Sequence, residues 1–257
     1  MALHVRQSRG AQGTQAFALA RTRASAHCDR VSARHNSCAH SHRAPDETPP
    51  RARSAQCGLA GDGSALAGIA ALTGLTTLVL SGNALTGIPA AIGKLKALKT
   101  FECEANDLTT LPDEMKKLKA LEVLRLQRNK LASLASLSKL TNLVVLDASF
   151  NALATLDFDL SNKTRLGTLL LKGNELTELP EDAGDLEALQ SLNVSDNKLT
   201  ELPASMGGLE KKLKEIVCDG NVFADPKLRK LVGGKVKDIL KYLQKAGSGK
   251  GKGKKKK

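Results

Sequence analysis

The strongest constraint on the fold is an asparagine that returns at almost constant spacing along the chain. The series is Asn83, Asn106, Asn129, Asn151, Asn174, Asn197 and Asn221, with spacings of 23, 23, 22, 23, 23 and 24 residues. Each asparagine ends a pattern of the form L-x-x-L-x-L-x-x-N-x-L, as in residues 121–131. Self-similarity at a fixed period of this length indicates a solenoid, in which each unit packs only against its neighbours.

The residues before each asparagine predict a short β-strand. In Leu78-Val79-Leu80 the leucines alternate with another residue, and a period of two places the leucines on one face of a strand. One unit cannot bury its own leucines, so stacked units should share a core, with parallel strands lining a concave face. An asparagine side chain can bond the backbone groups that a sharp turn leaves unpaired. The seven asparagines are therefore predicted to form a structural ladder.

The second half of each unit should return the chain along the outer side. A proline follows the last apolar residue in Ile88-Pro89, Leu111-Pro112, Leu179-Pro180 and Leu202-Pro203, but not in Leu134-Ala135 or Leu156-Asp157. Proline suits the first turn of a helix, where its missing N–H is no loss. We therefore expect short helices or 3₁₀ turns outside, a less regular middle, and an α/β fold overall.

Changes of composition divide the chain into four segments. Residues 1–57 lack sustained periodicity and predict a disordered basic extension, with a transit peptide or a wrongly chosen start codon as alternatives. Residues 58–221 form the solenoid of about seven repeats, and residues 222–246 carry the apolar spacing of a helical C-terminal cap. Residues 247–257 form a lysine-rich tail with nothing to bury, which we expect to be disordered. We expect no transmembrane segment, because no apolar run is long enough.

The net charge of +13 belongs to the two ends of the chain. Residues 1–57 hold 9 Lys/Arg against 3 Asp/Glu, residues 58–221 hold 17 against 21, and residues 222–257 hold 13 against 2. The candidate polyanion-binding residues of the tail are Lys250, Lys252, Lys254, Lys255, Lys256 and Lys257. Lysine contacts to phosphate release counterions, so weak nucleic-acid binding through the tail is one possible function.

The sequence offers no set of residues for catalysis. All five histidines lie before residue 58, which leaves the repeats without the commonest general base. The thiols and imidazoles of His27, Cys28, His35, Cys38, His40 and His42 match no familiar zinc spacing. We therefore expect no metal, cofactor, small-molecule substrate or enzymatic activity. Cys103 and Cys218 replace strand leucines, and the absence of a disulfide framework favours a cytoplasmic location, with an organelle or the nucleus as alternatives.

The residues that alternate with the strand leucines should project from the concave face. Val79, Val123, Val145, Leu170 and Val217 are expected to form one exposed apolar row, which Glu102, Arg125 and Asp147 share. The candidate partner-binding residues are Val79, Glu102, Glu104, Val123, Arg125, Gln127, Val145, Asp147, Leu170, Lys172, Asn193 and Val217. An apolar stripe with a few charges is typical of a protein-binding surface. The leading hypothesis is a monomeric, non-enzymatic scaffold, and the alternative is a nucleic-acid or ribosome-associated protein that uses its basic tail.

The repeats resemble the intracellular L-x-x-L-P-x-x-[IL]-G-x-L class of leucine-rich-repeat proteins. The segments "GNVFADPKLRKLV" and "VKDILKYLQK" are similar to the end of the array in leucine-rich-repeat proteins that continue into a tRNA-synthetase-like B3/B4 domain. We expect that domain to be absent, because the chain passes into the lysine tail instead. The resemblance implies a horseshoe that binds other proteins, which in several relatives are small GTPases or phosphatases.

Overall fold

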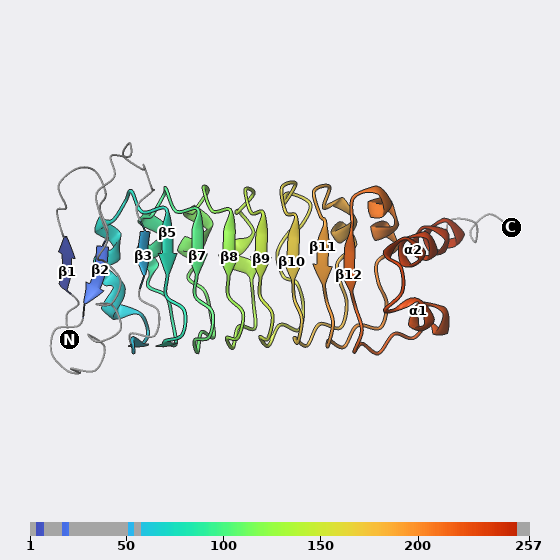
Figure 1. The fold of residues 1–257 in the computed structure, drawn as a ribbon, viewed down its shortest axis with the longest axis horizontal. Helices are drawn as coiled ribbons and strands as arrows, with labels where there is room; N and C mark the ends of the chain where they lie inside the picture. Colours follow the sequence, from blue (N-terminus) through green and yellow to red (C-terminus); the bar gives the residue numbers. More distant parts are fainter. Residues whose placement is uncertain (1–3, 8–16, 21–50, 54–57, 251–257) are drawn as a thin grey trace, which may run out of the picture.

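The molecule is an elongated stack of short strands with helices at its C-terminal end (Figure 1). The computed structural model describes residues 4–7, 17–20, 51–53 and 58–250. Ten of the strands form one sheet in the order β1-β2-β3-β5-β7-β8-β9-β10-β11-β12. Two more, β4 (Ala60–Gly61) and β6 (Ala84–Leu85), form a small parallel pair. The fold is therefore a solenoid in which each turn adds one strand.

The seven repeat strands lie where the periodicity predicts them. They are β5 (Thr77–Val79), β7 (Thr100–Glu102), β8 (Val123–Arg125), β9 (Val145–Asp147), β10 (Thr168–Leu170), β11 (Ser191–Asn193) and β12 (Glu215–Val217). All are parallel to their neighbours, and the central residue of each strand pairs with that of the next. The predicted parallel sheet is confirmed.

One hydrophobic core runs the length of the solenoid. It extends from Leu59 through the strand leucines to Leu243, and Phe101 stands in the leucine position of β7 with no exposed surface. Cys103 and Cys218 are buried in the same core, as predicted. Each repeat thus buries its apolar residues against the repeats before and after it, which is why a single unit would not fold alone.

Burial of the two described cysteines leads to a prediction about their reactivity. Burial raises the pKa of Cys103 to about 12 and that of Cys218 to about 11. The thiolate is the reactive form, so neither thiol should react with an aromatic disulfide reagent at mildly alkaline pH while the chain is folded. The test uses a variant with serine at positions 28, 38 and 57, in which denaturant should release two equivalents of reactive thiol. Fast labelling without denaturant would contradict the buried positions.

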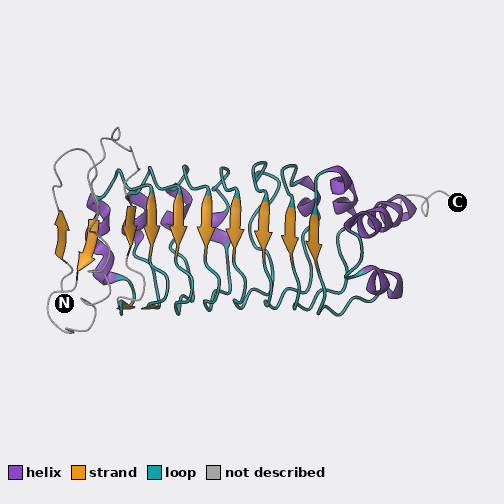
Figure 2. Ribbon diagram, viewed as in Figure 1, coloured by secondary structure: helices purple, strands orange, loops and turns teal. Residues whose placement is uncertain are grey.

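The return segments contain 3₁₀ helices, which Figure 2 shows beside the strands. These are η1 (Ser64–Ala71), η2 (Ala90–Lys94), η3 (Asp113–Lys117), η4 (Ala135–Leu137), η5 (Glu181–Asp185) and η6 (Ala204–Lys211). Pro89, Pro112, Pro180 and Pro203 precede η2, η3, η5 and η6 in extended conformation, one residue earlier than the first helical turn in which the sequence placed them. The middle is less regular, as predicted: η4 has three residues, and no helix is assigned between β9 and β10, a stretch described throughout.

Two α-helices close the C-terminal end of the core, as predicted. Helix α1 (Pro226–Leu231) begins after Asp225, whose carboxylate accepts the Lys227 N–H at 2.7 Å. Helix α2 (Val236–Lys250) buries Ile239, Leu240 and Leu243. The helix continues past the predicted boundary at residue 246, so the expectation of an irregular chain is wrong for residues 247–250. Gly247 still lies against η6, where an added Cβ would be 3.2 Å from Ala204 Cβ. Residues 251–257 lie outside the described residues.

Three strands in the N-terminal segment extend the sheet beyond the first repeat. They are β1 (His4–Gln7), β2 (Phe17–Ala20) and β3 (Arg51–Arg53). Strand β3 is parallel to β5 and β2 is parallel to β3, whereas β1 is antiparallel to β2. At these residues the structure differs from the expected lack of secondary structure. The reason is that an edge strand presents a row of unpaired backbone groups to which another segment can pair. The cysteines and the other four histidines of residues 1–57 lie outside the described residues.

Candidate protein-binding face

The side chains that flank the central residue of each strand form a surface that we call the sheet face. Its first row is Thr77, Thr100, Val123, Val145, Thr168, Ser191 and Glu215. Its second row is Val79, Glu102, Arg125, Asp147, Leu170, Asn193 and Val217. Two residues further along, Ser81, Glu104, Gln127, Ser149, Lys172, Ser195 and Asp219 continue the alternation. The face therefore contains every candidate partner-binding residue.

The single apolar row expected from the sequence is wrong. Val123 and Val145 pair with each other in the first row, whereas Leu170 and Val217 belong to the second. Val79 is in the second row but is only 9% exposed, so it contributes little to the surface. Distance from the ladder asparagine decides the row: Val123 and Val145 stand six residues before it, and the others stand four before it. The apolar part of the face is thus a central valine pair in the first row, with Leu170 and Val217 apart from it in the second.

Charged side chains fill the row next to this valine pair, from Glu102 to Asp147, and most charged residues of the face have a partner on it. Arg125 Nε lies 3.9 Å from Glu102 Oε1, in the predicted charged row, and Asp147 follows Arg125 in register. Glu104 accepts a hydrogen bond from Gln127 Nε2 at 3.2 Å. The acidic residues of the face are Glu102, Glu104, Asp147, Glu215 and Asp219, and the basic ones are Arg125 and Lys172. The face as a whole is therefore acidic, in contrast to the basic ends of the chain.

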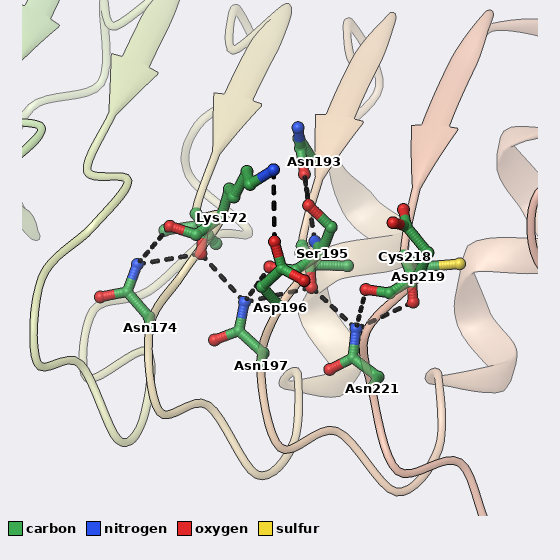
Figure 3. Close-up of polar contacts among 11 residues, drawn as sticks. Lys172, Asn174, Asn193, Ser195, Asp196, Asn197, Cys218, Asp219 and Asn221 are labelled. Carbon is green, nitrogen blue, oxygen red and sulfur yellow. Dashed lines mark hydrogen bonds and ion pairs between the residues drawn. The ribbon is translucent and has the colours of Figure 1, made fainter.

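The asparagine ladder fixes one edge of this face. Asn174 Nδ2 donates to Leu171 O at 2.9 Å and to Ala148 O of the preceding repeat at 3.0 Å. Its Oδ1 accepts the N–H of Leu153, also in the preceding repeat, at 3.1 Å. Figure 3 shows the same arrangement of donors at Asn197 and Asn221. These bonds satisfy backbone groups of the turn, as expected of a structural ladder, and they also join each repeat to its neighbour.

The residue before each asparagine adopts the left-handed conformation. The seven positions are Gly82, Ala105, Arg128, Phe150, Gly173, Asp196 and Gly220, with φ between 52° and 69°. Phe150 is the unusual member, since a bulky residue rarely adopts positive φ. It is 45% exposed, and the Arg128 guanidinium carbon lies 5.8 Å from the centre of its ring. A Cβ on Gly173 would come within 2.6 Å of Phe150 Cδ1, so the ring requires glycine there.

The sequence reasoning missed Phe150, which lies beside the face at the end of β9. A signal was present in the sequence: the position before the asparagine is glycine in three repeats and aromatic in only one. An exposed aromatic side chain held at positive φ is a reason to consider a function for the residue. Phe150 is therefore added to the candidate residues of the sheet face.

The sequence analysis also did not single out Lys163, whose side chain is fully buried. It occupies the column filled in other repeats by Leu95, Leu118, Leu140, Leu186 and Leu209. Its ammonium group donates to Ser138 O at 2.9 Å, Asp159 O at 3.1 Å and Asn162 Oδ1 at 2.5 Å. Burial lowers the pKa of Lys163, and the three acceptors satisfy all of its protons. The arrangement leaves no ammonium proton for a ligand, so we assign Lys163 a structural role.

The described part of the chain shows no constellation for metal chemistry. Within residues 4–7, 17–20, 51–53 and 58–250, no three His, Cys, Asp or Glu side chains are grouped so that they could hold a metal ion. No helix in those ranges is long and apolar enough to cross a membrane. The potential zinc ligands of residues 27–42 lie outside these ranges, so the structure does not bear on them.

The repeated strand, asparagine turn and return segment match a known family pattern. The family model for the leucine-rich repeat matches residues 74–95 and 188–209. The chain carries leucine-rich repeats. This family is commonly used for protein–protein interaction and is typically non-enzymatic. No curated protein matches the chain.

Solved leucine-rich-repeat structures share the fold. A leucine-rich-repeat protein of Leptospira interrogans is 31% identical over 62% of this chain, with a TM-score of 0.58. An internalin of Listeria monocytogenes is 22% identical over 76% of the chain, with a TM-score of 0.60, and shows the fold alone. The receptor kinase ectodomain GASSHO1/SCHENGEN3 of Arabidopsis thaliana, solved in complex with CASPARIAN STRIP INTEGRITY FACTOR 2, is 26% identical over 66%, with a TM-score of 0.57. The matches span 41%, 52% and 24% of those chains, respectively.

Proposed function

We propose that the chain is a scaffold that binds a partner protein on its sheet face. The observation that carries this proposal is the central valine pair, Val123 and Val145, with the charged Glu102, Arg125 and Asp147 in the next row of the face. Both valines are only partly buried, although they sit on a rigid sheet. Small apolar contacts at the centre with polar groups at the rim are the usual anatomy of a protein interface. The common use of the repeat family for protein binding supports the same conclusion.

The charges of the face specify the kind of partner. Five acidic and two basic side chains make the contacting surface acidic. A partner with basic side chains around a small apolar centre would be electrostatically complementary, and complementarity favours specificity and fast association. The exposed Phe150 ring, next to Arg128, adds an aromatic anchor at the edge, a residue type enriched at interfaces. The binding area is therefore proposed to centre on β8, β9 and the turn after β9, and to reach the acidic residues of β7 and β12 at its two ends.

The test is a pair of lysine substitutions at the valine centre, Val123→Lys and Val145→Lys together. Lysine would repel a basic partner and abolish the apolar contact, so we expect affinity for the partner to fall at least tenfold. The purified full-length chain is immobilised, and extract with and without nuclease treatment is passed over it before quantitative mass spectrometry. Any partner found is then remeasured by titration with purified components.

The matched control places the same two charges elsewhere on the same repeats. Ala132 and Ala154 each lie three residues after the asparagine and are exposed outside the strands, so Ala132→Lys with Ala154→Lys should keep the partner. Both variants should keep the circular dichroism of the parent chain. If the valine variant retains every partner, or if nuclease removes all of them, protein binding through the sheet face is wrong. Loss after nuclease would instead favour nucleic-acid binding through the tail.

A further inference from the structure

A pocket of about 360 Å³ lies between the last repeat and the C-terminal cap. Its apolar wall comes from distant parts of the chain, including Leu202 and Pro203 before η6, Leu228 of α1, and Leu243 of α2. Helix α2 continues along one side, and Ala246 is the last residue that lines the pocket. Ligand sites are commonly about 300 to 1,000 Å³, so this pocket suits a side chain or another small group.

The charges that line this pocket are all negative. They belong to Glu181, Glu201 and Asp225, and no lysine or arginine side chain is among the lining residues. Hydrogen bonds from the Tyr242 hydroxyl and the Lys227 N–H lower the pKa of Asp225, so its carboxylate is ionised at neutral pH. Two cations lie beside the lining residues: Lys227, whose charge acts on Asp225, and Arg229, which donates to Ala224 O at 3.3 Å. Three carboxylates against these two cations leave the site acidic.

An apolar wall with carboxylates and a phenol ring matches the chemistry of a lysine side chain. The alkyl stem of lysine packs against apolar surface while its ammonium group stays near charge and water. The face of a tyrosine ring also attracts an ammonium group, and Tyr242 lines this pocket. We propose that the pocket binds lysine side chains of the chain's own tail, residues 251–257.

The length of the tail is sufficient for this contact. Residues 246 to 250 carry the chain about 6 Å along the axis of α2, at the usual rise of a helix. Seven further residues can span up to about 23 Å when extended, so the tail can return over the pocket. Five of those seven residues are lysines, namely Lys252, Lys254, Lys255, Lys256 and Lys257. The complementary charges therefore lie within reach of each other, and the contact should weaken as salt screens them.

The chain has a built-in probe for this contact. It contains one tyrosine and no tryptophan, so its tyrosine fluorescence comes from Tyr242 in the pocket wall. A bound tail should shield the ring from acrylamide, a neutral quencher. The test variant replaces the five tail lysines with glutamine in the full-length chain, which keeps the tail length. We expect its quenching constant to be about twofold higher than that of the parent, and high salt should remove the difference.

Substitution of the pocket carboxylates tests the same contact independently, from the side of the pocket. Glu181→Gln with Glu201→Gln should raise the quenching constant to the same value, and adding the glutamine tail should raise it no further. Asp113→Asn is the matched control, because Asp113 follows Pro112 in η3 as Glu181 follows Pro180 in η5, far from the pocket. This control should behave as the parent does. Melting curves that coincide with the parent curve will show that no variant has lost the cap.

Two results would overturn the proposal. The first is an unchanged quenching constant in the glutamine-tail variant at low salt. The second is a shielding effect that grows with protein concentration, because it would place the tail of a second molecule in the pocket. A carbodiimide cross-link between Glu181 or Glu201 and a tail lysine of the same molecule, located by mass spectrometry, is the expected positive result.

Discussion

Asn129→Ala should lower the free energy of unfolding by about 2 to 4 kcal/mol, through an orphaned N–H and weakened bonding between repeats. In the folded chain Asn129 Oδ1 accepts the buried Leu108 N–H at 3.0 Å, and its Nδ2 donates to Cys103 O and Leu126 O at 2.9 Å each. Alanine leaves the Leu108 N–H without its partner. The two carbonyls keep a second donor, because Asn106 also donates to Cys103 O and Asn151 to Leu126 O.

Asn174→Ala should lower the free energy of unfolding by about the same amount, because it leaves the Leu153 N–H without its acceptor. The control is Lys139→Ala, an exposed side chain on the outer side of the same solenoid, which should change stability by less than about 0.5 kcal/mol. Urea unfolding followed by circular dichroism measures all three variants. Equal midpoints for the asparagine and lysine variants would contradict the role of the ladder.

The strands and the ladder could be predicted because one residue type fixes their positions. Each strand begins six residues before its asparagine, so knowing Asn106 or Asn197 is enough to place Thr100–Glu102 or Ser191–Asn193. This part of the fold depends on the local sequence. The alternating leucines decide which face of each strand is buried, and the turn after the strand needs the side-chain amide of asparagine. The same regularity made it possible to predict the return segments that contain proline.

The arrangement of the face was predicted only in part, although the sequence contained the answer. Val123 and Val145 differ from Leu170 by two residues in their distance to the asparagine, which moves them along the strand by one side chain on the same face. They therefore lie in a neighbouring row, next to Thr100 and Thr168. Counting from the asparagine places both rows correctly, whereas the apolar character of the side chains does not.

Other features depend on contacts between elements and leave little trace in the local sequence. The pocket forms because α2 packs on η6 and brings Tyr242 to Asp225, seventeen residues away. The exposed Phe150 ring is accommodated only because the next repeat has Gly173. The strands β1 to β3 occupy the open edge of β5, which no periodicity in residues 1–57 indicates. In each case the deciding partner lies in another repeat or segment.

Gly207→Ala should displace the C-terminal cap and lower the free energy of unfolding by about 1 to 3 kcal/mol, the usual cost of overpacking. Gly207 lies in η6, where an added Cβ would be 2.7 Å from Gln244 N and 2.8 Å from Gln244 Cα. Both are backbone atoms of α2, so they cannot rotate away as a side chain can. Helix α2 must therefore move as a unit, and its buried Ile239 and Leu243 would lose packing against the last repeat.

The adjacent Gly208 provides the control, because a Cβ there would meet nothing within 4 Å. Gly208→Ala should leave stability unchanged or raise it by a few tenths of a kcal/mol, since alanine reduces the entropy of the unfolded chain. Thermal melting separates the two, with an expected shift of about 2 to 4 °C per kcal/mol for a chain of this size. The Gly207 variant should also expose Tyr242 to quencher, because displacement of α2 opens the pocket between the cap and the last repeat. Equal melting temperatures for the two alanine variants would mean that α2 does not pack on η6 in solution.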